Sequence, residues 1–185
     1  MREAGARFVI FKASQGTHFA DSSYFTGWDV AKQAGLLRGC YHYLDWSASA
    51  EEQAAHYCAV YNPDSELPPI ADYEEYSESP ARALEYLKIF CEAVKARTGR
   101  IPLIYTSPGH WAEYGSPNPY WDQYPLWIAH YTDNPAPTVP QPWSDYIIWQ
   151  YTSQGDGDEY GVEAEYIDLN LFNGSLADLR KFCRT

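Results

Sequence analysis

Seven short apolar runs lie along the chain, and the first four are about 30 residues apart, the length of a strand, a helix and their connections. Each run is apolar at consecutive positions, as strands buried on both faces of a parallel sheet are. The predicted strands are 7–12, 39–43, 69–72, 101–105, 126–129, 146–150 and 166–170.

Helix-like segments separate the early strands. The clearest begins at Ser79 and Pro80, an N-cap residue followed by a proline at the first helical position, and ends at Gly99. After residue 105 helix-like segments become rare. Loops rich in Pro, Gly and acidic residues are predicted instead at 135–142 and 154–165. The predicted helices are 24–34, 47–61, 80–98 and 175–184.

This alternation of strand and helix predicts an α/β fold, either a βα barrel or a doubly wound sheet. We find no internal repeat and no linker, so we expect one domain over residues 1–185. A βα barrel has eight strands. The chain opens with Glu3-Ala-Gly-Ala, which reads as the tail of a helix, so a barrel would need one more strand before it.

The charge of the chain excludes several classes of partner. The net charge is −12, and no Lys or Arg lies between Arg100 and Arg180, so we expect no nucleic-acid groove. No apolar run is long enough to span a bilayer, and the first residues contain no secretory signal. The four cysteines form no C-x-x-C pair, which argues against zinc and predicts buried thiols.

Three carboxylates stand out by their position. Asp72 and Glu74 follow the third predicted strand and, two residues apart, point the same way. Because like charges held together raise the pKa of one partner, such a pair suits acid catalysis of glycosidic cleavage. The alternative is an acidic surface loop. Asp168 interrupts the last apolar run. A carboxylate buried there is costly unless it is paired or has a function.

Aromatic residues make up 17% of the chain, and five of them lie at or just past the ends of predicted strands. Planar rings at the rim of a carboxylate site are suited to packing against pyranose rings, although a single ring of this kind is more often part of a core. This predicted aromatic rim consists of Tyr43, Tyr105, Trp127, Tyr131 and Trp149.

An ordered set of short motifs covers essentially the whole chain. It consists of Phe8-Val-Ile-Phe-Lys-Ala-Ser-Gln-Gly16, Gly35-Leu-Leu-Arg-Gly-Cys-Tyr-His-Tyr43, Asp72-Tyr-Glu74, Pro102-Leu-Ile-Tyr-Thr106, Pro125-Leu-Trp-Ile-Ala129, Ile148-Trp-Gln-Tyr-Thr152 and Ile167-Asp-Leu-Asn170. Together these motifs resemble the family 25 glycoside hydrolases, the N-acetylmuramidase lysozymes of bacteria, phages and fungi. Each motif is weak alone, but the ordered set is specific.

The resemblance implies an irregular, TIM-like barrel whose last strands lack helices, and hydrolysis of the β-1,4 bond between N-acetylmuramic acid and N-acetylglucosamine in peptidoglycan. By its position in the family's Asp-x-Glu motif, Glu74 is expected to be the general acid, and Asp72 to support the acetamido group or the developing cation. Asp168 lines the same pocket, and we expect Gln150 to bind an acetamido group. No metal or organic cofactor is implied. The expected place of action is the cell wall, outside the cell, reached by release of the phage-endolysin type.

One departure from the family is plain. Family members open with a strand carrying an Asp-x-Ser motif, and no such segment precedes Phe8. Without it, strands 7–12 and 166–170 would present unpaired edges, which invite pairing with another chain. We therefore expect either self-association through this gap or its closure by local rearrangement.

The motifs leave two other functions open. A barrel glycosidase of the chitinase type also uses an Asp-x-Glu strand end, although 69–72 lacks the longer acidic run usual there. A non-catalytic wall-binding protein, inactive without the first strand, is the second. Assays on chitin and peptidoglycan separate these functions.

Overall fold

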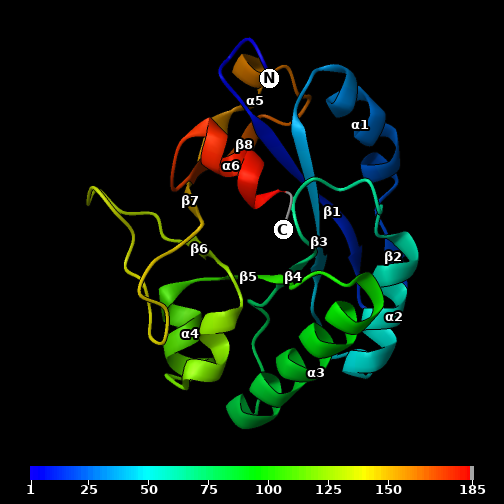
Figure 1. The fold of residues 1–185 in the computed structure, drawn as a ribbon, viewed down its shortest axis with the longest axis vertical. Helices are drawn as coiled ribbons and strands as arrows, with labels where there is room; N and C mark the ends of the chain where they lie inside the picture. Colours follow the sequence, from blue (N-terminus) through cyan, green and yellow to red (C-terminus); the bar gives the residue numbers. More distant parts are fainter. Residues whose placement is uncertain (184–185) are drawn as a thin grey trace.

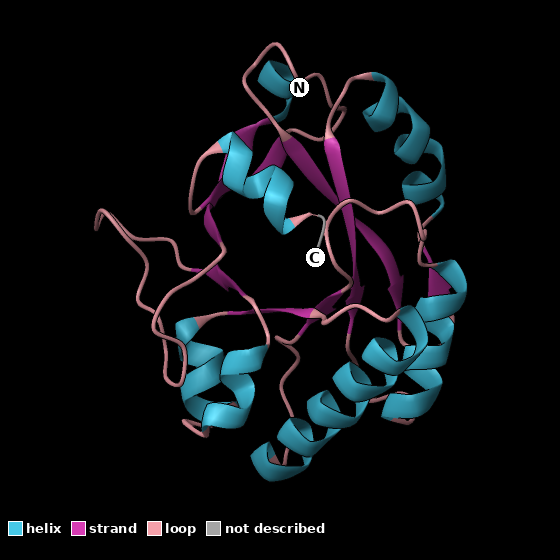
Figure 2. Cartoon of the chain, viewed as in Figure 1, coloured by secondary structure: helices cyan, strands magenta, loops and turns pink. Residues whose placement is uncertain are grey.

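The structure is a computed structural model that describes residues 1–183, and it contains one mixed sheet with helices around it (Figures 1 and 2). The strands are β1 (Phe8–Gln15), β2 (Phe19–Ala20), β3 (Leu37–Tyr43), β4 (Ile70–Asp72), β5 (Leu103–Thr106), β6 (Leu126–Ala129), β7 (Ile148–Asp156) and β8 (Tyr166–Phe172). The helices are α1 (Ser22–Gln33), α2 (Ala50–Val60), α3 (Pro80–Thr98), α4 (Pro108–Tyr114), the 3₁₀ helix η1 (Pro119–Gln123), α5 (Gly157–Tyr160) and α6 (Leu176–Phe182).

The eight strands follow the order β2-β1-β3-β4-β5-β6-β7-β8. Strands β1 and β3 to β7 pair in parallel, whereas β2 and β8 are antiparallel to their neighbours at the two ends. The predicted α/β fold is confirmed, but the sheet curls without closing into a barrel, because β1 and β8 are not hydrogen-bonded neighbours. All seven predicted strands are present, and β2, of only two residues, is the additional one.

The parallel strands are short and are separated by well-delimited helices. Helix α3 begins at Pro80 and ends at Gly99, whose φ of +72° and N–H bond to the Lys95 carbonyl close it as predicted. Ser79 holds the N-cap position without a side-chain hydrogen bond. Helix α2 begins at a capping box in which Ser49 and Glu52 each bond the other's backbone N–H.

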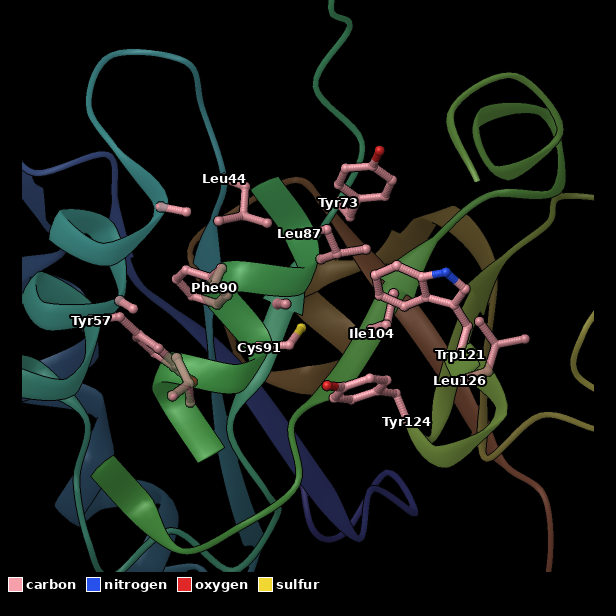
Figure 3. Close-up of a cluster of buried hydrophobic side chains, with 14 of the residues drawn as sticks. Leu44, Tyr57, Tyr73, Leu87, Phe90, Cys91, Ile104, Trp121, Tyr124 and Leu126 are labelled. Carbon is pink, nitrogen blue, oxygen red and sulfur yellow. The ribbon is translucent and has the colours of Figure 1, made fainter. Parts of the chain in front are cut away.

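Two cores lie on the two faces of the sheet. On the outer face, Tyr57 of α2 and Phe90 and Cys91 of α3 lie near Ile104 of β5 (Figure 3). On the inner face, a smaller cluster of Ile70, Leu103, Tyr105, Trp127 and Ile148 is covered in part by Phe182 of α6. Each fully buried apolar side chain contributes roughly 1.5–3 kcal/mol to the free energy of unfolding. Burial of these side chains therefore stabilises the packing on both faces of the sheet.

The last third of the chain differs most from prediction. Strand β7 continues to Asp156 and α5 occupies Gly157–Tyr160, inside the predicted loop 154–165. Helices α4 and η1, of seven and five residues, were missed because such short elements show too little periodicity. The last helix ends at Phe182, and Arg184 of the predicted range lies outside the described residues.

Two further expectations concern the cysteines and membranes. All four cysteines are free; Cys40 and Cys91 are buried as predicted, whereas Cys58 and Cys183 are only half-buried. Within residues 1–183, no helix combines the length and the apolar character needed to cross a membrane.

Candidate active site

The register of the parallel strands brings three predicted site residues to one face at the carboxyl edge of the sheet. Tyr43 of β3 lies opposite Asp72 of β4, and Asp72 lies opposite Tyr105 of β5. Trp127 of β6 continues this row beside Tyr105. Glu74 follows Asp72 by two residues at the end of β4 and therefore emerges on the same side.

Strand β8 brings the third carboxylate from the other end of the sheet. Asn170 of β8 lies opposite Gln150 of β7, and the Trp127 indole Nε1 donates a hydrogen bond of 2.8 Å to Asn170 Oδ1. Asp168 precedes Asn170 by two residues, so both side chains lie on the inner face. The charge of Asp168 acts on both Asp72 and Glu74, so the three predicted carboxylates form one group.

Asp72 is the most deeply placed of the three. Its side chain is only 5% exposed, and Oδ1 has no hydrogen-bond partner among residues 1–183. Burial raises the pKa of Asp72 well above its ordinary value; the charges of Glu74 and Asp168 raise it further, and Lys12 opposes them. This oxygen is itself buried, so no hydrogen bond among the described residues offsets the cost of removing it from water.

Glu74 stands at the mouth of the site, where its side chain reaches solvent. Partial loss of water around its carboxyl raises the pKa of Glu74; the charges of Asp168 and Glu75 add to the rise, and Lys12 opposes it. Burial also raises the pKa of Asp168. Because all three pKa values are raised, the group retains a proton above the pH at which free carboxyls lose theirs.

Gln150 connects two of the predicted aromatic residues. Its Oε1 accepts hydrogen bonds of 2.8 Å from the hydroxyls of both Tyr105 and Tyr131. Gln150 and Tyr105 are buried, whereas Tyr131 is 55% exposed. Tyr105 and Trp127 meet edge to face with ring centroids 4.6 Å apart, so they form the floor of the site rather than its rim.

The structure does not bring Trp149 to this site. Trp149 lies opposite Ile128 of β6 on the outer face, where it joins the core under the helices. Its Nε1 donates to the His130 carbonyl. Trp149 and Gln150 are adjacent on one strand, so they must point to opposite faces, and the prediction counted both in the same site.

Lys12 and Tyr43 add a cation and a phenol beside the carboxylates. Lys12 Nζ lies 4.9 Å from the centroid of the Tyr43 ring and donates to Gln15 Oε1 at 2.7 Å. The Tyr43 hydroxyl donates to Glu75. Among the described residues no carboxylate is close enough to Lys12 to form an ion pair. The positive charge of Lys12 therefore acts on the carboxylates electrostatically from a longer distance.

Sequence reasoning missed Tyr41 and Asn170. Tyr41 lies two residues before Tyr43, and the charges of Asp72, Asp168 and Glu74 add to the burial that raises its pKa. Strand alternation from Tyr43 was enough to indicate Tyr41. In the same way, Asn170 lies two residues beyond Asp168 on β8, so alternation was enough to indicate it, whereas its position opposite Gln150 depends on the antiparallel register of β8.

A cavity of about 880 Å³ lies between β1 and β8 and opens beside the carboxylates. Lys12, Tyr41, Trp127, Gln150 and Asp168 line one end of it, while Asp72 and Glu74 lie outside its lining. Among residues 1–183 no three His, Cys, Asp or Glu side chains are grouped as metal ligands would be. The arrangement thus offers acid chemistry beside a cleft of ligand size.

Known proteins resemble this chain over most of its length. The family model for Glycosyl hydrolases family 25 matches residues 1–160. Lysozyme M1 of Streptomyces globisporus is 32% identical over 97% of this chain, and an N,O-diacetylmuramidase of Arthroderma benhamiae is 30% identical over 97%. The chain covers 64% and 78% of these two proteins. The muramidase structure from Trichobolus zukalii has a TM-score of 0.85 and 30% identity, covering 99% of this chain and 90% of that one.

The length covered differs among the relatives. The chain spans 65% of the Escherichia coli protein YegX, at 30% identity, and so just under two thirds of the first curated relatives that it matches.

Proposed function

Because the chain belongs to glycosyl hydrolase family 25, we propose that it hydrolyses the β-1,4 bond between N-acetylmuramic acid and N-acetylglucosamine in peptidoglycan. The observation that carries the proposal is the grouping of Asp72, Glu74 and Asp168 at one edge of the sheet, each with a raised pKa. The named activities of the lysozyme and muramidase relatives support the substrate class.

In this proposal Glu74 is the general acid. It stands at the solvent end of the group, where a leaving-group oxygen can reach its proton, and its raised pKa keeps that proton available. Asp72 lies deeper and, when ionised, supplies negative charge that supports the developing cation or the acetamido group. Asp168 sets the local field.

Sugar binding is assigned to the side chains around this group. Tyr131 offers an exposed ring, and Tyr43 stands beside Asp72. Tyr105 and Trp127 form the floor. Gln150 orients both tyrosines through one oxygen, so its assigned role changes from a direct acetamido contact to a support for Tyr131.

The substrate proposal is tested by product analysis. We expect the protein to release new reducing ends from purified peptidoglycan, with muramic acid at those ends, and none from chitin. Release from chitin alone would favour the chitinase-type function. Binding to walls without new reducing ends would favour a non-catalytic wall protein. We propose that the protein acts on the cell wall, outside the producing cell.

The open sheet edges carry the proposal of self-association. Among residues 1–183, β1 pairs with β2 only at Ser14 and Gln15, and β8 pairs only with β7, so the rest of that β1 edge and the outer edge of β8 have no strand partner. On β8, Tyr166 and Leu171 are 54% and 51% exposed. Free edges of apolar strands template pairing with another chain.

We expect light scattering to show a concentration-dependent dimer. Leu171→Lys should shift the protein towards monomer, because a charged edge opposes strand pairing. The matched control is Val30→Lys, because Val30 is also an exposed apolar residue but lies on helix α1 rather than on a sheet strand. A monomer at every concentration, or equal effects of the two variants, would contradict this proposal.

A further inference from the structure

Two exposed aromatic side chains outside the predicted rim lie at the same edge of the sheet as the carboxylates. Trp46 follows the end of β3 by three residues, and Tyr76 follows Glu74 by two. Strands β3 and β4 are neighbours, so both loops leave the sheet side by side. Trp46 is 36% exposed and Tyr76 is 73% exposed.

Both rings are held in place before any ligand arrives. The Trp46 indole Nε1 donates a hydrogen bond of 2.7 Å to the Tyr76 carbonyl, which ties the two loops together. The Trp46 ring meets Tyr86 edge to face at 5.2 Å, and the Tyr76 ring meets His110 in the same way at 5.8 Å. A prearranged surface binds with a smaller entropy cost than a loose one.

The position of these rings relative to Tyr131 is informative. Tyr131 follows β6 and is exposed on one side of Glu74, while Trp46 follows β3 on the other side; Tyr76 lies on the loop of Glu74 itself, with its ring against His110 of α4. Exposed rings therefore flank the general acid on both sides along the strand order. A chain of sugars that crosses the edge of the sheet past Glu74 would meet an aromatic ring at each end.

We infer that Trp46 and Tyr76 form an outlying sugar platform, which binds a pyranose ring of the glycan strand beyond the sugars at Glu74. The apolar C–H face of such a ring packs on an aromatic face, as planar apolar groups do. The platform makes the enzyme prefer long glycan strands over short ones. This inference rests on the proposed function, because it concerns the same substrate.

The test measures how affinity depends on glycan length. In the Glu74→Gln background, calorimetry gives the Kd for peptidoglycan glycans of two and of six sugars. Adding Tyr76→Ala should weaken binding of the six-sugar glycan by about three- to tenfold, the usual worth of an aromatic contact, and leave the two-sugar glycan unchanged. Tyr76→Phe keeps the ring face and should retain the parent affinity. Phe25→Ala, which removes a ring 53% exposed on α1, is the matched control.

A second measurement guards against a variant that does not fold. Tryptophan fluorescence should change on addition of the six-sugar glycan, and Trp46→Phe should remove that part of the change. Equal loss of affinity for both glycans with Tyr76→Ala, or no loss for either, overturns the platform while leaving the proposed function in place. Failure of the Glu74→Gln protein to bind either glycan overturns both.

Discussion

Glu74→Gln is expected to abolish wall lysis while leaving the fold and sugar binding in place. Glutamine matches the shape of glutamate but cannot deliver a proton to the leaving oxygen. Loss of a general acid costs about 10²–10⁴-fold in rate. The measurement is clearing of a peptidoglycan suspension, together with circular dichroism and the Tm to show that the variant is folded.

The matched control for this variant is Glu78→Gln. Glu78 is an exposed acid in the same loop, four residues beyond Glu74, so the two variants change the net charge equally. It should retain parent activity. If Glu74→Gln kept more than a few per cent of the parent activity, another residue would be the general acid. If both variants lost activity equally, the effect would come from the change in net charge.

The carboxylate group could be predicted from the sequence because its cause is local. Asp72 and Glu74 lie two residues apart at the end of an apolar run, and alternation along the chain places them on one face. Asp168 was indicated by its position inside another apolar run. These patterns require no knowledge of which strands are neighbours.

Two residues of the last strands were mispredicted, for different reasons. Trp149 and Gln150 were both assigned to the site because each lies near a strand end, although adjacent residues on a strand cannot share a face. Asn170 shares a face with Asp168 by alternation, but its position opposite Gln150 depends on the antiparallel register of β8, and every strand was expected to be parallel. The end of the sheet, where β8 reverses direction, was therefore the least predictable part of the fold.

The second large effect is expected for Asp72→Asn, which should lower the rate of turnover by about 10²–10³-fold, the cost of removing preorganised charge at a transition state. Asparagine keeps the size of the side chain and removes its charge next to the developing cation. The variant should still bind glycan. Full activity would show that Asp72 plays no electrostatic part.

The pH profile of the remaining activity gives a sharper result. Asp72 and Glu74 interact, so their two ionisations belong to the pair. The pKa of Asp72 is raised by burial and by the charge of Glu74, so the pair retains its last proton to a higher pH than either carboxyl would alone. With Asn at position 72, one like charge is gone, and Glu74 loses its proton at a lower pH. The alkaline limb should therefore move to lower pH, and an unmoved limb would contradict the coupling.

Stability provides a readout that does not depend on activity. Asp72 is ionised in the unfolded chain above its ordinary pKa, whereas burial holds its folded-state pKa well above that value. Between these two pKa values the folded state binds the extra proton, so the free energy of unfolding falls as pH rises. Asp72→Asn removes this pH-dependent loss of stability. The Tm of the variant minus the Tm of the parent should therefore be more positive at pH 7 than at pH 4. A side chain with only a structural role would lower the Tm at both pH values when replaced. A gain confined to neutral pH would thus identify Asp72 as a carboxylate kept in place at a cost to stability, which is expected of a group that acts on substrate.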